Sequence, residues 1–179
     1  MTVSHGRIHI DWGLPENFRI QTDRLDLVPG EPQPADTDWQ ERGRLSELLT
    51  AHVPNQWPPD LVVDRSSPDG AGWWNWYIVR RELDQPVLIG MAGIKGWPAV
   101  SGSVQTGCAF LPQFQGQGCG TEAIKGLTSW LLARPQVERV IAETPVDNDG
   151  ANSVLRKVGF VLSNSNTEEG LLRFEKTRT

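Results

Sequence analysis

The chain has 179 residues, of which 38% are hydrophobic, and it therefore fits one globular domain with a sizeable core. Its net charge of −5 argues against nucleic acid as a partner. No run of about 18 apolar residues exists, which argues against a membrane span, and the first residues lack the apolar segment of a secretory signal. The two cysteines form neither a metal-like cluster nor a disulfide scaffold. We therefore expect a cytoplasmic protein that binds no metal.

Strand-like runs dominate the first half of the chain, and strands and helices alternate in the second half. Apolar and β-branched runs predict strands at residues 18–21, 25–28, 73–79, 87–94, 104–111, 137–144, 161–162 and 171–174. Apolar residues at helical spacing predict helices at residues 37–52, 118–133 and 149–158. This order predicts an α/β (α+β) domain, in which a mixed sheet carries helices on both faces.

The most informative segment joins a strand to the longest predicted helix. An apolar run ends at Pro112, Gly116, Gly118 and Gly120 follow at every second position, and the helix begins at once. Glycines let the backbone approach a ligand closely, and the first N–H groups of a helix attract anions. The segment therefore predicts a phosphate-binding loop.

Two well-known phosphate loops do not fit this segment. Gly120 is followed by Thr121 and not by lysine, which argues against a nucleotide-hydrolase loop. The glycine spacing of two and two does not match the dinucleotide pattern. The pattern that fits is Gln-x-x-Gly-x-Gly, formed by Gln115, Gly118 and Gly120. An ordinary glycine-rich turn before a helix stays open as the alternative.

The Gln-x-x-Gly-x-Gly segment resembles the acyl-CoA pyrophosphate loop of the Gcn5-related N-acetyltransferase (GNAT) superfamily. Three further segments resemble the ribosomal-protein (RimJ/RimL-type) branch of that superfamily. They are Thr22–Leu27, Leu88–Gly93 and the stretch from Ile141 to Phe160. The resemblance covers residues 18 to 174 in the order of the family. It implies an acetyltransferase domain at 18–179 after an N-terminal extension at 1–17. It also implies a mostly antiparallel sheet, splayed between its fourth and fifth strands, with acetyl-CoA in the gap.

The resemblance also names a cofactor-binding set. Its members surround the loop or lie on the following strand and helix: Phe110, Leu111, Gln115, Gly116, Gln117, Gly118, Cys119, Gly120, Thr121, Asn148 and Leu155. Asn148 is also a strong candidate for the N-cap of the following helix. Cys119 lies inside the loop without a histidine nearby in the sequence, so we do not expect a nucleophile there.

Transfer to an amine needs a group that removes the ammonium proton. Glu143 ends a buried-strand pattern where relatives carry a carboxylate base, and it is our candidate base; a solvated strand-end glutamate is the alternative. Gln105 replaces a glutamate that related chains carry, and an amide orients a water or substrate but accepts no proton. Leu155 replaces a tyrosine that would protonate the departing thiolate, so no acid is expected there.

The eight tryptophans allow two interpretations. Trp57 lies among prolines, and Trp74 and Trp76 share one face of a predicted strand, so these three are candidates for the wall of a substrate pocket. Core packing, or an apolar surface of a homodimer, is the alternative.

Three functions compete at this stage. The first is acetyl-CoA-dependent N-acetyltransfer to a primary amine, either a protein N-terminus or a small-molecule amine. The second is a non-catalytic acyl-CoA-binding or sensor protein on the same scaffold, which Gln105 and Leu155 keep open. The third, an unrelated phosphate-binding α/β protein, conflicts with four motifs in register.

Overall fold

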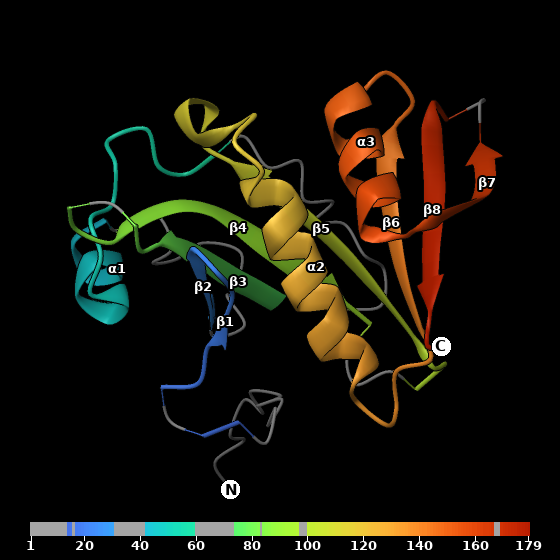
Figure 1. Ribbon diagram of the computed structural model, residues 1–179, viewed down its shortest axis with the longest axis horizontal. Coiled ribbons are helices and arrows are strands. Elements are labelled where there is room, and N and C mark those ends of the chain that lie inside the picture. The colour runs from blue at the N-terminus through green and yellow to red at the C-terminus, as the bar shows by residue number, and fades with distance from the viewer. Residues whose placement is uncertain are drawn as a thin grey trace, which may run out of the picture.

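The computed structural model describes residues 14–15, 17–30, 42–59, 74–82, 84–96, 100–166 and 169–179. Figure 1 shows a sheet with helices packed against it. The strands are β1 Ile20–Gln21, β2 Leu25–Pro29, β3 Trp74–Arg80, β4 Val87–Lys95, β5 Ser103–Phe110, β6 Arg139–Pro145, β7 Val161–Asn166 and β8 Leu171–Thr177. The helices are α1 Arg42–Leu49, α2 Cys119–Leu132 and α3 Asp149–Val158, with a 3-10 turn at Pro112–Phe114. None of the described helices is long and apolar enough to cross a membrane.

The described strands form one eight-stranded sheet in the order β1-β2-β3-β4-β5-β6-β8-β7. Every neighbouring pair is antiparallel except β5 and β6, which run parallel. The predicted mixed, mostly antiparallel sheet is therefore confirmed. The parallel pair results from the crossover through α2, which returns the chain to the end of the sheet where β5 began.

Helices cover both faces of this sheet, as predicted. Strand β4 shows why, because its side chains alternate between two cores. Ile89 and Ile94 pack toward α2 and α3 in the larger core, whereas Leu88 and Met91 pack with α1 in the smaller one. The strand is buried on both sides, so its sequence reads as an almost continuous apolar run.

The parallel pair separates soon after it begins. Backbone pairing runs from Ser103↔Arg139 to Gln105↔Ile141, yet β5 continues to Phe110 and β6 to Pro145. The predicted splay between the family's fourth and fifth strands is therefore present, and it lies between β5 and β6 in Figure 1. No described strand pairs with the backbone groups along this opening, so within the described part of the chain they are open to a ligand.

Helix α3 begins and ends where local signals place it. Asn148 caps α3 by accepting a hydrogen bond from the Ala151 N–H at 3.0 Å, and Gly159 terminates the helix with a φ of +96°. Helix α3 has the predicted bounds, and α2 differs from its predicted bounds by one residue at each end. Helix α1 is shorter than predicted: it spans Arg42–Leu49, and residues 37–41 lie outside the described part of the chain.

The tryptophans correct one expectation. Trp76 is fully buried, with its ring centroid 5.0 Å from that of Trp130 and the two rings tilted, and Trp57 keeps 6% of its surface and packs with Tyr77 in the smaller core. Their indoles therefore fill the interior and do not line an open pocket. Trp74 begins β3, but its side chain lies outside what the structure describes. Leu14, which lies within the predicted N-terminal extension at 1–17, packs against the larger core. The boundary between that extension and the domain at 18–179 stays a prediction.

Candidate functional site

The glycine loop ends in an uncapped helix N-terminus. Gly116 and Gly118 have φ values of +71° and +81°, and Gly118 occupies the N-cap position of α2 without a side-chain cap. Among the described hydrogen bonds, none uses the N–H of Gly116, Gln117 or Gly118. The first N–H groups of α2 also lack partners within the helix. Consecutive free donors and the positive end of the helix dipole make this segment suited to a phosphate.

Three other predicted members of the cofactor set, Gln115, Cys119 and Leu111, bond to or pack against the protein interior next to the loop. Gln115 donates from Nε2 to the Phe110 carbonyl at 3.0 Å and so ties the loop to the end of β5. Cys119 is buried in the larger core, which supports the expectation that it is not a nucleophile. Leu111 is fully buried and its N–H donates to the Ile89 carbonyl, so neither group is free for a cofactor. Leu111 was predicted to contact the cofactor directly, but its side chain packs in the smaller core.

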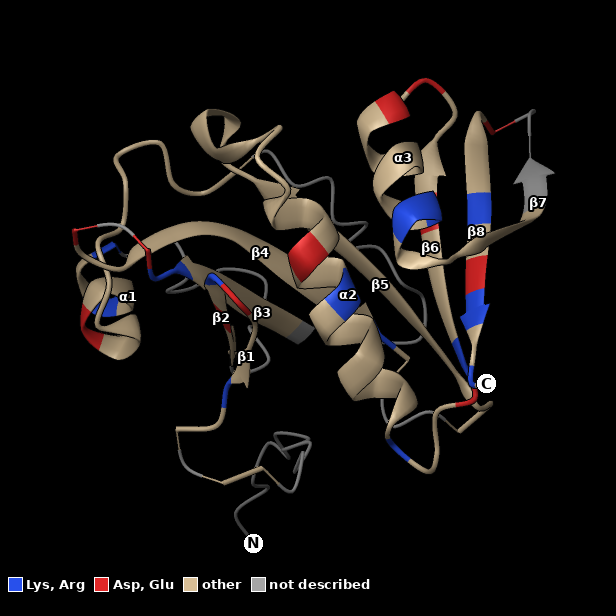
Figure 2. Ribbon diagram, viewed as in Figure 1, with Lys and Arg blue, Asp and Glu red and all other residues tan. Residues whose placement is uncertain are grey.

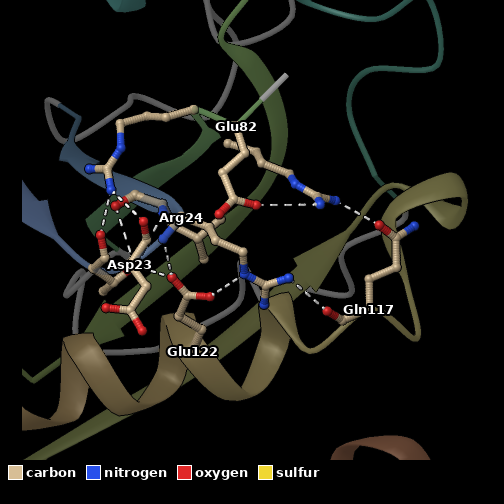
Figure 3. Close-up of polar contacts among 9 residues, drawn as sticks. Asp23, Arg24, Glu82, Gln117 and Glu122 are labelled. Atoms are coloured by element: carbon tan, nitrogen blue, oxygen red, sulfur yellow. Dashed lines mark hydrogen bonds and ion pairs between the residues drawn. The ribbon is translucent and has the colours of Figure 1, made fainter. Parts of the chain in front are cut away.

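A polar network beneath the loop was not predicted from the sequence (Figure 3). Glu122, in the first turn of α2, accepts hydrogen bonds from Thr22 Oγ1 at 2.6 Å and from the Arg24 backbone N–H at 2.7 Å. Arg24 also donates from Nε to Glu122 at 2.7 Å and from Nη1 to the Gln117 carbonyl at 3.0 Å. Arg80 donates from Nη1 to Gln117 Oε1 at 2.6 Å. The loop is thus anchored to the turn before β2 and to the end of β3.

The network leaves Glu122 ionised. Burial alone would raise the pKa of this carboxyl, but the hydrogen bonds from Thr22 and Arg24 outweigh burial and lower it. The Thr22–Leu27 segment carried the resemblance, yet its sequence offers no sign that it reaches a helix about a hundred residues later.

The β5–β6 opening has donors along both edges. The Leu111 N–H bonds to β4, and antiparallel strands alternate, so the N–H groups of Cys108 and Phe110 point away from β4 and into the opening. The Val146 N–H bonds to the Gly170 carbonyl beside β8, which by the same alternation turns the Glu143 N–H toward β5. A ligand arm that carries amides could pair with both edges.

Two predicted catalytic side chains lie together beside this opening. Gln105 Nε2 lies 3.3 Å from Glu143 Oε2, and Arg173 Nη1 lies 3.2 Å from Glu143 Oε1. Arg173 Nε also lies 3.4 Å from Glu175 Oε1. Basic and acidic residues alternate along β8, as Figure 2 shows. Glu143 is partly exposed and held from two sides. Sequence reasoning missed Arg173, because its strand pairs with β6 only through tertiary structure.

Two further predicted residues, Asn148 and Leu155, belong to α3 and its N-cap, which follow β6 in the chain. Asn148 caps α3, and its contact with a cofactor stays a prediction. Leu155 keeps 6% of its surface and packs in the larger core. Thr144 follows Glu143 on the unpaired part of β6, and its Oγ1 is buried without a hydrogen-bond partner in the described residues. Sequence reasoning missed this hydroxyl, because burial alone distinguishes it from other threonines.

Comparison with known proteins gives one family and many similar folds. The model of the acetyltransferase (GNAT) domain matches residues 32–161. An uncharacterized N-acetyltransferase of Bacillus subtilis (strain 168), YjdG, is 32% identical over 97 residues, which are 54% of this chain and 56% of that protein. The chain thus spans little more than half the length of this curated relative.

Solved structures extend the similarity to nearly the whole chain. A RimL ribosomal L7/L12 α-N-protein acetyltransferase in complex with coenzyme A has a TM-score of 0.61 at 16% identity, covering 89% of this chain and 98% of that chain. A GNAT-family acetyltransferase from Bacillus anthracis has a TM-score of 0.59 at 14% identity, covering 90% and 99%. At these identities the comparison supports the fold.

Proposed function

Because the chain belongs to the GNAT acetyltransferase family, we propose that it is an acetyl-CoA-dependent N-acetyltransferase that acts on a primary amine. One observation supports this most strongly: the free N–H groups of the glycine loop lie at the end of β5, where β5 and β6 separate. A phosphate donor set and an open strand edge are thereby joined in one continuous site. Acetyl-CoA supplies a pyrophosphate for the first and an amide-bearing arm with an activated thioester for the second.

The residues present fit this cofactor. The N–H groups from Gly116 to Thr121 would hold the pyrophosphate, and glycine at 116 and 118 keeps side chains out of its way. The N–H groups of Cys108, Phe110 and Glu143 would pair with the amides of the arm. Asn148, exposed at the N-terminus of α3, would contact the same arm or hold the backbone beside it.

We further propose that Glu143 removes the ammonium proton, directly or through water. An amine attacks as a free base, and a lysine amine with a pKa of about 10.4 is almost wholly protonated at neutral pH. Glu143 lies beside the strand opening, and Gln105 and Arg173 orient its two carboxylate oxygens. In the ternary complex the amine would bond to the acyl carbon, and the carbon–sulfur bond would break to release the thiolate of CoA.

Departure of the thiolate has no acid at the expected position. Leu155 offers no proton, and a thiol of pKa about 8.5 is a tolerable leaving group without one. The proposed enzyme therefore relies on positioning more than on acid catalysis, since aligned substrates contribute several kcal/mol.

The acceptor is proposed by chemical class. The RimL structure is named for an α-amino group of a ribosomal protein, and this chain shares its fold. A protein N-terminus and a small-molecule amine both remain candidates here. Trp57 and Trp76 are buried and do not line a pocket for either kind of amine, so selectivity for the acceptor must come from other residues.

The test is thiol release from acetyl-CoA with a panel of amines that includes N-terminal peptides and polyamines. We expect release that depends on both substrates, with an acetylated amine confirmed by mass. Tight CoA binding without release for any amine would instead support the alternative, a non-catalytic acyl-CoA-binding protein.

A further inference from the structure

Gln117 is held at both of its oxygen atoms by arginines: Arg24, in the turn just before β2, and Arg80, the last residue of β3. Arg24 Nη1 donates to the main-chain carbonyl at 3.0 Å, and Arg80 Nη1 donates to the side-chain Oε1 at 2.6 Å. The Gln117 amide nitrogen donates in turn to the Gln113 carbonyl at 2.9 Å. Figure 3 shows Arg24 between Gln117 on the loop and Glu122 on α2. The residue before the helix N-cap is therefore fixed through both its main chain and its side chain.

Holding the Gln117 carbonyl also orients the next N–H. The carbonyl of Gln117 and the N–H of Gly118 belong to one peptide unit, and in a trans peptide they point in opposite directions. With the carbonyl turned toward Arg24, the Gly118 N–H must point away from Arg24, to the open side of the loop. No described hydrogen bond uses that N–H, so it is free for a ligand.

The charge of Arg24 is largely matched by its own partner. Its Nε lies 2.7 Å from Glu122 Oε2, and Glu122 also binds the Arg24 backbone N–H. A guanidinium that faces a carboxylate and a carbonyl contributes little net attraction to a distant phosphate. Its two-point bridge, from Glu122 to Gln117, is a geometric device that a shorter side chain with one charged nitrogen does not reproduce.

We infer that Arg24 is a positioning residue: by holding the Gln117 carbonyl, it points the Gly118 N–H at the pyrophosphate of the cofactor. This inference rests on the proposed function, because it assumes that the loop binds that pyrophosphate. Arg80 steadies only the Gln117 side chain and has a secondary role.

The experiment compares Arg24→Lys and Arg24→Gln with wild type in CoA titrations and in turnover. Two acyl donors are used: acetyl-CoA, and S-acetylpantetheine, which has the thioester and arm without the pyrophosphate. Arg19→Gln is the matched control, because Arg19 pairs with buried Asp26 at 3.0 Å on β2 and has no described contact with the loop. Thermal unfolding of each variant separates folding from binding.

We expect both Arg24 variants to bind CoA about tenfold more weakly, as loss of charge-assisted hydrogen bonds implies. Turnover of S-acetylpantetheine should stay within about twofold of wild type, because a donor without pyrophosphate does not use the Gly118 N–H. Arg19→Gln should leave both donors unchanged. Arg80→Gln should weaken CoA less than Arg24→Lys does.

Each contrary result has a distinct meaning. CoA affinity restored by lysine would overturn the inference in favour of simple charge attraction. An equal loss for both donors would overturn it in favour of a general folding defect. If Arg24 variants do not fold, Glu122→Gln, which weakens the anchor of Arg24, must still show the pyrophosphate-selective loss, or the inference is wrong. A wild-type protein that binds no CoA contradicts the proposed function itself.

Discussion

Gly118→Val tests the loop at the point where backbone conformation and ligand approach coincide. Gly118 has a φ of +81°, and a Cβ placed there would lie 3.3 Å from Arg24 Nη2. A left-handed conformation costs a residue with a side chain about 1–2 kcal/mol. For a domain of this size, that corresponds to a fall in unfolding midpoint of about 2–8 °C. Valine would also turn the N–H at 118 away from the phosphate or crowd it.

CoA affinity of the folded Gly118→Val variant should therefore fall by more than about tenfold, which is about 1.4 kcal/mol. Isothermal calorimetry measures this directly. Gly170→Val is the matched control, because Gly170 has a φ of +67° in the turn between β7 and β8 and nothing within 4 Å of an added Cβ. It should lose similar stability and no affinity. Unchanged CoA affinity in a folded Gly118→Val protein would refute the assignment of the phosphate to this loop.

Three other predictions test the site and its surroundings. Glu143→Gln should lower turnover near neutral pH by about 10²-fold with little change in CoA affinity, and high pH should recover part of the loss; wild-type turnover at every pH would make Glu143 structural. Burial raises the pKa of Tyr77 to about 12, and as the single tyrosine it should ionise in an absorbance titration only above pH 11 while the protein stays folded. Glu122 has a lowered folded-state pKa, so its stabilisation is present above the unfolded pKa of about 4.3 and is lost as pH falls through the folded value. The difference in unfolding midpoint between wild type and Glu122→Gln should therefore shrink below about pH 4, and a constant difference would contradict the network around Thr22 and Arg24.

The elements predicted best are those whose ends are coded locally. Helix α3 begins at the Asn148 cap and stops at Gly159, and both signals act within a few residues of the helix end. The start of α2 was found in the same way, from the glycines before it. Strand β5 was predicted at 104–111 and spans Ser103–Phe110, so the prediction is shifted by one residue, because Leu111 is as apolar as the strand before it and packs in the smaller core.

The site was predicted only in part, because contacts between distant segments decide which side chains meet and which are exposed. Glu143 and Gln105 were chosen from strand ends and from the family pattern, and their 3.3 Å contact follows from the parallel pairing of β5 with β6. Trp57, in a proline-rich segment, and Trp76, on a strand, looked suitable for a pocket, but an aromatic side chain in either setting suits a core equally well. Their exposure depends on what packs above them, which is a property of distant segments.

The sequence by itself determined the local parts of this protein: the helix ends, the glycine loop and the order of motifs that identifies the family. These are coded by short-range chemistry, since a cap, a glycine or an apolar period acts within one turn or one strand. Only the tertiary structure decided that Arg24 reaches Glu122 and Gln117, and that Arg173 holds Glu143. These contacts join residues many positions apart, and sheet register and helix packing bring them together.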